Sequence, residues 1–233
     1  LAGISYVQLN KVYKEASYAN ENTVPSIEAL HRASIAYYQV RTLTLYHILS
    51  SHMTSIDANA VKADYSKRIK DMLAQTEGHL KAYESLVSGA EDKALIDQEK
   101  ALLGDYVKGV ELVLAASSES RTDDAMQEIA KMGDLPARLA AALEAHMKFN
   151  NELANKEAQK AVEAIRNAIK QKGGNELEIV VRRDGKNINV KLVPEYNQES
   201  NSYVIGIVFG RIRRYGLMPA IGLAFNQAGR IMI

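Results

Sequence analysis

Helical periodicity runs through most of the chain and limits what it can fold into. From residue 6 to about residue 171, apolar residues recur every three or four positions, as on a helix that buries one face. Turn-forming residues interrupt this pattern at "SIDANA" (55–60), at Ser88-Gly89 and at Gly133. Long helices joined by short turns pack as antiparallel neighbours. The sequence therefore predicts a mainly α fold, an antiparallel up-down four-helix bundle.

These turns also set the expected helix boundaries. We expect long helices at about 6–53, 57–87 and 92–116, then a short helical piece, then a fourth long helix after Asp134. Asp57 can cap the second helix with its carboxylate, since aspartate is a preferred N-cap residue. Pro25 is expected to bend the first helix, because proline removes an intrahelical hydrogen bond.

After Gly173-Gly174 the period of the apolar residues changes from 3.6 to 2. "ELEIVVRRDGKNINVKLVPE" predicts a β-hairpin that turns at Asp184-Gly185, and "SYVIGIVFG" predicts a third strand. An apolar helix is expected at the C-terminal end. Three strands and a helix make a poor core alone. We therefore divide the chain into a bundle domain, 1–165, and an incomplete β segment, 166–233.

Composition and motifs exclude several function classes. The net charge is +1 and the chain has no cysteine, so neither a nucleic-acid partner nor a thiolate nucleophile is expected. His47, His52, His79 and His146 have no second metal ligand at helical spacing, and no Gly-x-Ser-x-Gly occurs. We expect no metal, no cofactor and no enzyme activity. No run of 18 apolar residues occurs, although both ends are apolar enough to be parts of membrane segments or amphipathic helices.

The first helix carries an unusual seam. A 4-3-4-3 spacing places seven residues on the face expected to be buried: Ile27, His31, Ser34, Tyr38, Arg41, Leu45 and Ile48. Burying a guanidinium is costly without a partner or an anionic ligand. Antiparallel packing brings further polar residues to the height of Arg41. The predicted ligand-binding residues are Arg41, Tyr38, Thr44, Thr76, His79, Tyr106 and Arg138. The alternatives are that Arg41 reaches solvent or pairs with a carboxylate such as Asp71.

Two stretches carry a resemblance to a known family. "ENTVPSIEALHRASIAYYQVRTLTLYHIL" (21–49) and "LEAHMKFNNELANKEAQKAV" (143–162) resemble the first and fourth helices of the ligand-binding domain of bacterial methyl-accepting chemotaxis receptors. The resemblance covers residues 1–165. It implies a periplasmic sensor domain of a receptor anchored in the inner membrane, which binds a small organic acid and signals by helix displacement. It also implies a homodimer, for which Ile35, Leu43 and Tyr46 form an apolar outward strip.

A second resemblance covers the later part of the chain. "VEAIRNAIKQKGGNELEIVVRRDGKNINVKLVPEYN" (162–197) is similar to the later half of a PDZ domain from a site-2-type intramembrane metalloprotease. The front half of that domain is missing, and no histidine is followed by glutamate, so the zinc motif of the protease is absent. Two other functions stay open: a regulatory or substrate-gating module of an intramembrane protease, and a helical interaction domain without a small ligand.

Overall fold

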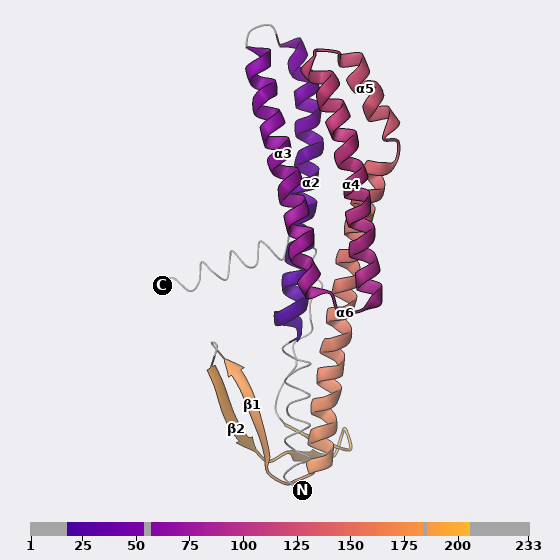
Figure 1. The fold of residues 1–233 in the computed structure, drawn as a ribbon. Helices are drawn as coiled ribbons and strands as arrows, with labels where there is room; N and C mark the ends of the chain where they lie inside the picture. The colour runs from indigo at the N-terminus through magenta and orange to yellow at the C-terminus, as the bar shows by residue number, and fades with distance from the viewer. Residues whose placement is uncertain (1–17, 54–56, 184–185, 206–233) are drawn as a thin grey trace. The chain divides into compact units, whose positions relative to one another are not determined.

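The computed structural model describes residues 18–53, 57–183 and 186–205. The chain divides into two compact units, Leu1–Ala168 and Ile169–Ile233. The first unit contains α2 (Val24–Leu49), α3 (Ala58–Tyr83), α4 (Ala90–Ser118), α5 (Thr122–Lys131) and most of α6 (Leu135–Lys172), whose last residues belong to the second unit. Figure 1 shows α2, α3, α4 and α6 running lengthwise beside one another, with the short α5 against α4. The prediction of a mainly helical bundle is confirmed.

Short helical turns of other types adjoin these helices. They are η1 (Ala19–Thr23), a π-helical turn, and the 3-10 turns η2 (Ser50–His52) and η3 (Glu84–Leu86). Pro25 lies in the first turn of α2, directly after η1. Because proline has no N–H to donate, a wider turn before it accommodates the lost hydrogen bond. The helix predicted from residue 6 is thus seen from residue 18 onward, and its earlier part lies outside the described residues.

Local sequence accounts for the start of α3 and the end of α6. The side chain of Asp57 accepts hydrogen bonds from the N–H groups of Asn59 at 3.0 Å and Ala60 at 3.2 Å. This confirms the predicted N-cap. Gly173 follows α6 with a φ of 54°, a left-handed conformation that glycine adopts without strain. The change of period at this glycine therefore does mark the end of the last long helix.

The core of the bundle is one continuous apolar cluster from α2, α3, α4 and α6. Its largest fully buried members are Leu30, Tyr37, Val40, Ile69, Leu80, Tyr83, Ile96, Leu139 and Leu143. Helix α4 contributes Leu102, Leu103, Tyr106 and Val110 to this cluster, and its Val113 is buried as well. Ile48, Val113, Ala116 and Ala125 form a second, smaller cluster where α5 covers α2 and α4.

The most deeply buried face of α2 is shifted by one position along the sequence from the predicted seam, of which Ser34 and Ile48 are buried as predicted. The helix buries Ser26, Leu30, Ala33, Tyr37, Val40, Thr44 and His47, which also follow a 4-3-4-3 spacing. Tyr38 is 48% exposed and Leu45 49% exposed, and Arg41 is exposed as well. The prediction that Tyr38 and Arg41 face the bundle centre was wrong. The adjacent face buries more apolar surface and leaves the guanidinium in water, which avoids the cost of desolvating it.

The second unit contains two small antiparallel sheets. Strand β1 (Leu177–Arg183) pairs with β2 (Lys186–Leu192), in a register that sets Leu177 opposite Leu192. The predicted hairpin is confirmed, although its turn at Asp184-Gly185 lies outside the described residues. Strand β3 (Glu195–Asn197), which the sequence analysis missed, pairs with β4 (Ser202–Val204). The predicted third strand begins at β4, and the C-terminal apolar helix lies outside the described residues.

Candidate functional site

The predicted ligand-binding residues divide into buried and exposed groups. Thr44 and Thr76 are buried, and each hydroxyl donates a 2.8 Å hydrogen bond to a carbonyl one turn back in its own helix, on Val40 and Met72. Such bonds satisfy the hydroxyl locally. Both threonine hydroxyls are therefore occupied within α2 and α3.

Arg138 and His79 do not join a common site with Arg41. Arg138 is exposed and lies 3.9 Å from the carboxylate of Asp134 in the preceding turn, and His79 is half-buried on α3. In the part of the chain that the structure describes, no hydrogen bond, ion pair or ring contact links either side chain to Arg41. The prediction that all these residues gather around Arg41 at one height of the bundle is therefore wrong for Arg138 and His79.

Arg41 instead lies beside a group of tyrosines. Its guanidinium carbon is 5.9 Å from the centre of the Tyr38 ring, within the range of a cation–π contact. The Tyr37 ring lies 5.4 Å from that of Tyr38 and 5.1 Å from that of Tyr106, so the three rings lead from the surface of α2 into the core. The Tyr37 hydroxyl donates to the carbonyl of Pro136 in α6. Tyr37 was missed because it lies one position from the predicted seam.

Burial and Arg41 act in opposite directions on these tyrosines. Burial raises the pKa of Tyr37 to about 12, although the nearby Arg41 guanidinium lowers it. Burial also raises the pKa of Tyr106, again against the charge of Arg41. Both phenols are therefore neutral at physiological pH, and neither compensates the positive charge of Arg41.

Among the described residues, Arg41 has no carboxylate partner, as is also true of Arg166 on α6. The other arginines between residues 18 and 139 each pair with a carboxylate: Arg32 with Glu28, Arg68 with Asp64, Arg121 with Glu119 and Asp124, and Arg138 with Asp134. Within the described residues, Arg41 has no carboxylate partner, and the alternative of an ion pair with Asp71 is not seen. It is a cation on the surface of the helix whose guanidinium interacts with Tyr37 and Tyr38 and with no carboxylate in the described part of the chain.

The surface around Arg41 is apolar. Large hydrophobic side chains are exposed on α2 at Ile35, Tyr38, Leu45, Tyr46 and Leu49, which we call the outer stripe. Leu43, predicted to belong to an outward strip, is instead buried in the core, whereas Ile35 and Tyr46 are exposed as predicted. Arg41 therefore lies beside exposed apolar side chains, and an exposed apolar patch of this kind often marks an interaction site.

Comparison with known families identifies the bundle. Residues 1–165 match the model of a family described as the four helix bundle sensory module for signal transduction. The chain belongs to this family. The match covers the bundle and ends before the β strands, so the PDZ-like interpretation of the later part stays a prediction. No curated protein matches the chain.

Membership in this family assigns the bundle to signal transduction. It is a signalling module of chemotaxis receptors and not a catalytic family. Among the described residues of the sensory module and the β segment, no group of three or more metal-ligating side chains occurs. The helices in this same part of the chain are all too short or too polar to cross a membrane.

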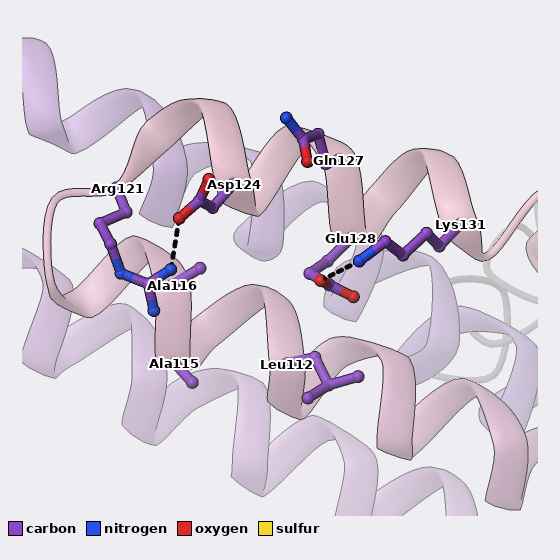
Figure 2. Close-up of a pocket in the computed structure, with 8 residues that line it drawn as sticks. All are labelled: Leu112, Ala115, Ala116, Arg121, Asp124, Gln127, Glu128 and Lys131. Atoms are coloured by element: carbon purple, nitrogen blue, oxygen red, sulfur yellow. Dashed lines mark hydrogen bonds and ion pairs between the residues drawn. The ribbon is translucent and has the colours of Figure 1, made fainter.

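A groove lies between α4 and α5 of the sensory module (Figure 2). Its volume is about 300 Å³, and its lining residues are Leu112, Ala115, Ala116, Arg121, Asp124, Gln127, Glu128 and Lys131. Figure 2 shows two ion pairs among its lining residues: Arg121, which directly precedes α5, pairs with Asp124, and Lys131 pairs with Glu128. Because these charges already neutralise one another, the groove is a weaker candidate for an anion than Arg41.

Two fully buried histidines form polar layers in the sensory module. The first, His47, lies between hydroxyls: Nδ1 is 2.8 Å from Ser117 Oγ and Nε2 is 2.9 Å from Ser66 Oγ. The buried Lys62 ammonium donates to the Ser117 carbonyl at 2.7 Å and to Ser120 Oγ at 3.0 Å. Burial and then the charge of Lys62 lower the pKa of His47. His47 is therefore held in its neutral form.

The second layer surrounds His146 on α6 and contains two carboxylates of α4. His146 Nε2 is 2.7 Å from Asp92 Oδ1, and Nδ1 is 3.0 Å from Glu99 Oε1. Tyr83 donates to Asp92 at 2.6 Å and accepts from the Asn150 amide at 2.7 Å. We call Asp92, Glu99 and His146 the buried triad. The sequence analysis missed it because His146 lies on α6, far in sequence from Asp92 and Glu99 on α4.

Proposed function

We propose that the bundle is the periplasmic sensor domain of an inner-membrane chemoreceptor, and that it binds a small organic acid at Arg41. One observation carries this proposal: Arg41 is held by a tyrosine ring on an apolar surface and has no carboxylate partner in the described part of the chain. A ligand carboxylate would supply the missing partner. Tyr38 is the second proposed contact, through its ring and hydroxyl.

The chemistry of the guanidinium favours a carboxylate over a neutral ligand. Its planar donors match the two oxygens of a carboxylate in a bidentate, charge-assisted pair. The aromatic contact with Tyr38 restricts the guanidinium before binding, so less conformational entropy is lost when the ligand arrives. Of the other predicted residues, Tyr106 supports this site through Tyr37, whereas Thr44, Thr76, His79 and Arg138 would act indirectly.

An exposed arginine needs a covering surface to bind a small anion tightly, because water screens an exposed pair. A second copy of the chain would provide that surface if the two outer stripes packed against each other. We therefore propose a homodimer with α2 of each subunit at the interface and the ligand beside it. The ligand would signal only through its different affinity for two arrangements of these helices.

The test begins with a thermal-shift screen of organic acids on the full chain, since a ligand of the folded state raises its stability with concentration. Calorimetry then compares the best acid on the parent, Arg41→Leu and Arg41→Lys. Loss of the guanidinium should cost roughly 2–5 kcal/mol of binding. Arg41→Lys should also bind more weakly, because an ammonium cannot form the planar fork.

Arg32→Leu is the matched control for this experiment. Arg32 lies on the same helix, is exposed and pairs with Glu28, so its loss should leave binding unchanged. Neither leucine variant should unfold the bundle, because both arginines are exposed. Equal binding by the parent and Arg41→Leu would reject the site. A screen in which no acid binds would favour an interaction domain without a small ligand.

The dimer has its own test in sedimentation equilibrium. Leu45→Glu and Leu49→Glu place charges in the outer stripe and should shift the full chain toward monomer, because an unpaired charge opposes burial at an interface. Leu112→Glu is the control, since Leu112 is equally exposed but lies on α4. A parent chain that is monomeric at all concentrations, with and without the acid, would contradict the dimer.

A further inference from the structure

The buried triad contains more negative charge than its surroundings compensate. Asp92 is fully hydrogen-bonded: it accepts from the Tyr83 hydroxyl, from His146 Nε2, and from the backbone N–H and hydroxyl of Ser88 at 2.7 and 2.8 Å. Burial alone would raise the pKa of Asp92, but these donors outweigh it and hold the pKa below its usual value. Asp92 is therefore an ionised carboxylate that keeps one proton on Nε2 of His146.

Glu99 is in the opposite situation. Its side chain is 0% exposed, and neither carboxylate oxygen has a hydrogen bond of good geometry to any described residue, although Oε1 lies 3.0 Å from His146 Nδ1. His146 Nδ1 likewise has no hydrogen bond of good geometry to a described residue. A buried carboxylate without donors is costly when ionised. Burial raises the pKa of Glu99 more than the facing imidazole lowers it.

The net charge of the triad depends on how many protons it binds. With Asp92 and Glu99 ionised and His146 neutral, the three groups carry a net charge of −2 inside the bundle. One proton between His146 Nδ1 and Glu99 reduces this to −1, and a second proton reduces it to zero. Because the groups interact strongly, the protons belong to the triad as a unit and not to one residue.

Among the residues that the structure describes, the elements packed against the triad offer no other cation to hold that charge. The facing groups are the Tyr83 hydroxyl from α3, Asp92 and Glu99 from α4, His146 and the Asn150 amide from α6, and the Ser26 hydroxyl from α2. Glu99 and Asp92 outweigh the effect of burial and raise the pKa of His146. A proton is thus the charge that this layer is built to accept.

We propose that the buried triad is a proton-binding site through which the sensory module responds to pH, in addition to its organic ligand. With the proton bound, His146 bridges both carboxylates and draws α6 against α4. Without it, two carboxylates face each other across a neutral imidazole, and their repulsion loosens the contact between α4 and α6. The change acts on α6 at the level where Ser26 in the first turn of α2 also approaches.

The position of the triad suits a role in signalling. It lies by the turn between α3 and α4, where the side-chain amide of Asn22, just before α2, donates to the Leu86 carbonyl at 2.6 Å. The triad thus borders the first turn of α2 and the N-terminal half of α6. A proton that changes the packing there acts on both helices directly, without passing through the rest of the core.

The experiment is a pH titration of the full chain, without ligand, followed by NMR of the histidine rings and the backbone amides. The chain has 5 histidines, and His146→Gln and His47→Gln assign the two buried ones. We expect the His146 ring to titrate with a midpoint above that of an exposed histidine, about 6.5. Amides of residues 92–99 and 146–150 should shift with the same midpoint, because the helices move with the proton.

Two further variants separate this proposal from its alternatives. Glu99→Gln removes a facing carboxylate and should move the His146 midpoint to lower pH, whereas His47→Gln should leave it in place. Arg41→Leu should also leave it in place, so failure at Arg41 and failure here are distinguishable. A His146 ring that does not titrate between about pH 5 and pH 9, or that titrates while the α4 and α6 amides stay fixed, would overturn the proposal. The parent titration stands even if a variant does not fold.

Discussion

His47 and His146 lie at opposite ends of the same bundle, and both side chains are fully buried. The pKa of His47 is lowered, whereas the pKa of His146 is raised. Burial disfavours the charged imidazole at both ends, so burial does not explain the difference. The partners do: serine hydroxyls and the Lys62 ammonium surround His47, and two carboxylates face His146. Each end of the bundle is thus built for a different protonation state.

The two ends also differ in how many hydrogen-bond partners their buried charged groups have. At the His47 end the buried charge is a single ammonium, Lys62, which keeps two oxygen acceptors. At the His146 end Asp92 has several hydrogen-bond donors, and Glu99 has none of good geometry among the residues that the structure describes. A buried polar layer whose hydrogen bonds are all made in one protonation state has a structural role. A layer that lacks hydrogen bonds until a proton binds can change its packing with pH. This contrast leads to three predictions.

The largest effect is expected from removing one charged member of each end. Asp92→Ala leaves His146, Tyr83 and Ser88 without their shared acceptor and should cost about 3–5 kcal/mol of stability. Lys62→Met keeps the aliphatic stem, and the Ser117 carbonyl still accepts the Ser120 N–H at 3.0 Å. Its cost should stay within about 1 kcal/mol.

Urea unfolding of the full chain measures both free energies. Because the wild-type chain is the common reference, the informative quantity is the difference between the two variants. Equal costs would mean that charge pairing does not distinguish the two ends.

Opposite pH dependence is the second expectation. The raised pKa of His146 gives stability that is fully present below about pH 6.5 and is lost as pH rises through the folded-state pKa. The raised pKa of Glu99 acts in the same direction, from about pH 4.3 upward. The lowered pKa of His47 acts the other way: stability falls as pH drops from about 6.5 to its folded-state pKa.

Unfolding free energies of the variants across pH separate these contributions. Each histidine contributes a slope of at most about 1.4 kcal/mol per pH unit. His146→Gln should flatten the alkaline side of the profile, and His47→Gln should flatten the acid side near neutrality. His52→Gln is the control, because His52 is exposed and should change neither slope. If both buried histidines affected the same side, the opposite electrostatics of the two ends would be wrong.

Sequence alone predicted the helices, the Asp57 cap and the β1–β2 hairpin, because each depends on residues close together in the chain. It could not fix which face of α2 is buried. Two adjacent sets, one through Tyr37 and one through Tyr38, both satisfy a 4-3-4-3 spacing and differ by one residue. Packing against the other helices and the cost of burying Arg41 decide between them.

The candidate sites show the same limit. Arg41 was identified as an unusual residue from its sequence neighbours, and its lack of a carboxylate partner among the described residues appeared only with the neighbouring helices in place. His146 and Asp92 are 54 residues apart, and His47 and Ser117 are 70 residues apart. No spacing on a single helix reveals such contacts, so neither histidine could be assigned a protonation state from the sequence.

The smallest expected effect comes from deleting one hydroxyl at each end. Ser88 Oγ donates to the ionised Asp92 at 2.8 Å, whereas Ser66 Oγ lies 2.9 Å from the neutral ring of His47. A hydrogen bond to a charged group contributes about 1.5–3 kcal/mol, and one between neutral groups about 0.5–1.5 kcal/mol. Ser88→Ala keeps the backbone N–H bond to Asp92, so the expected gap between the two alanine variants is about 1 kcal/mol. Ser85→Ala, which removes an exposed hydroxyl bonded only to the Ala82 carbonyl, gives the baseline in the same urea measurement. A cost for Ser66→Ala that equals or exceeds that for Ser88→Ala would show that the charge on Asp92 does not strengthen its hydrogen bonds, and the account of why Asp92 stays ionised would fail with it.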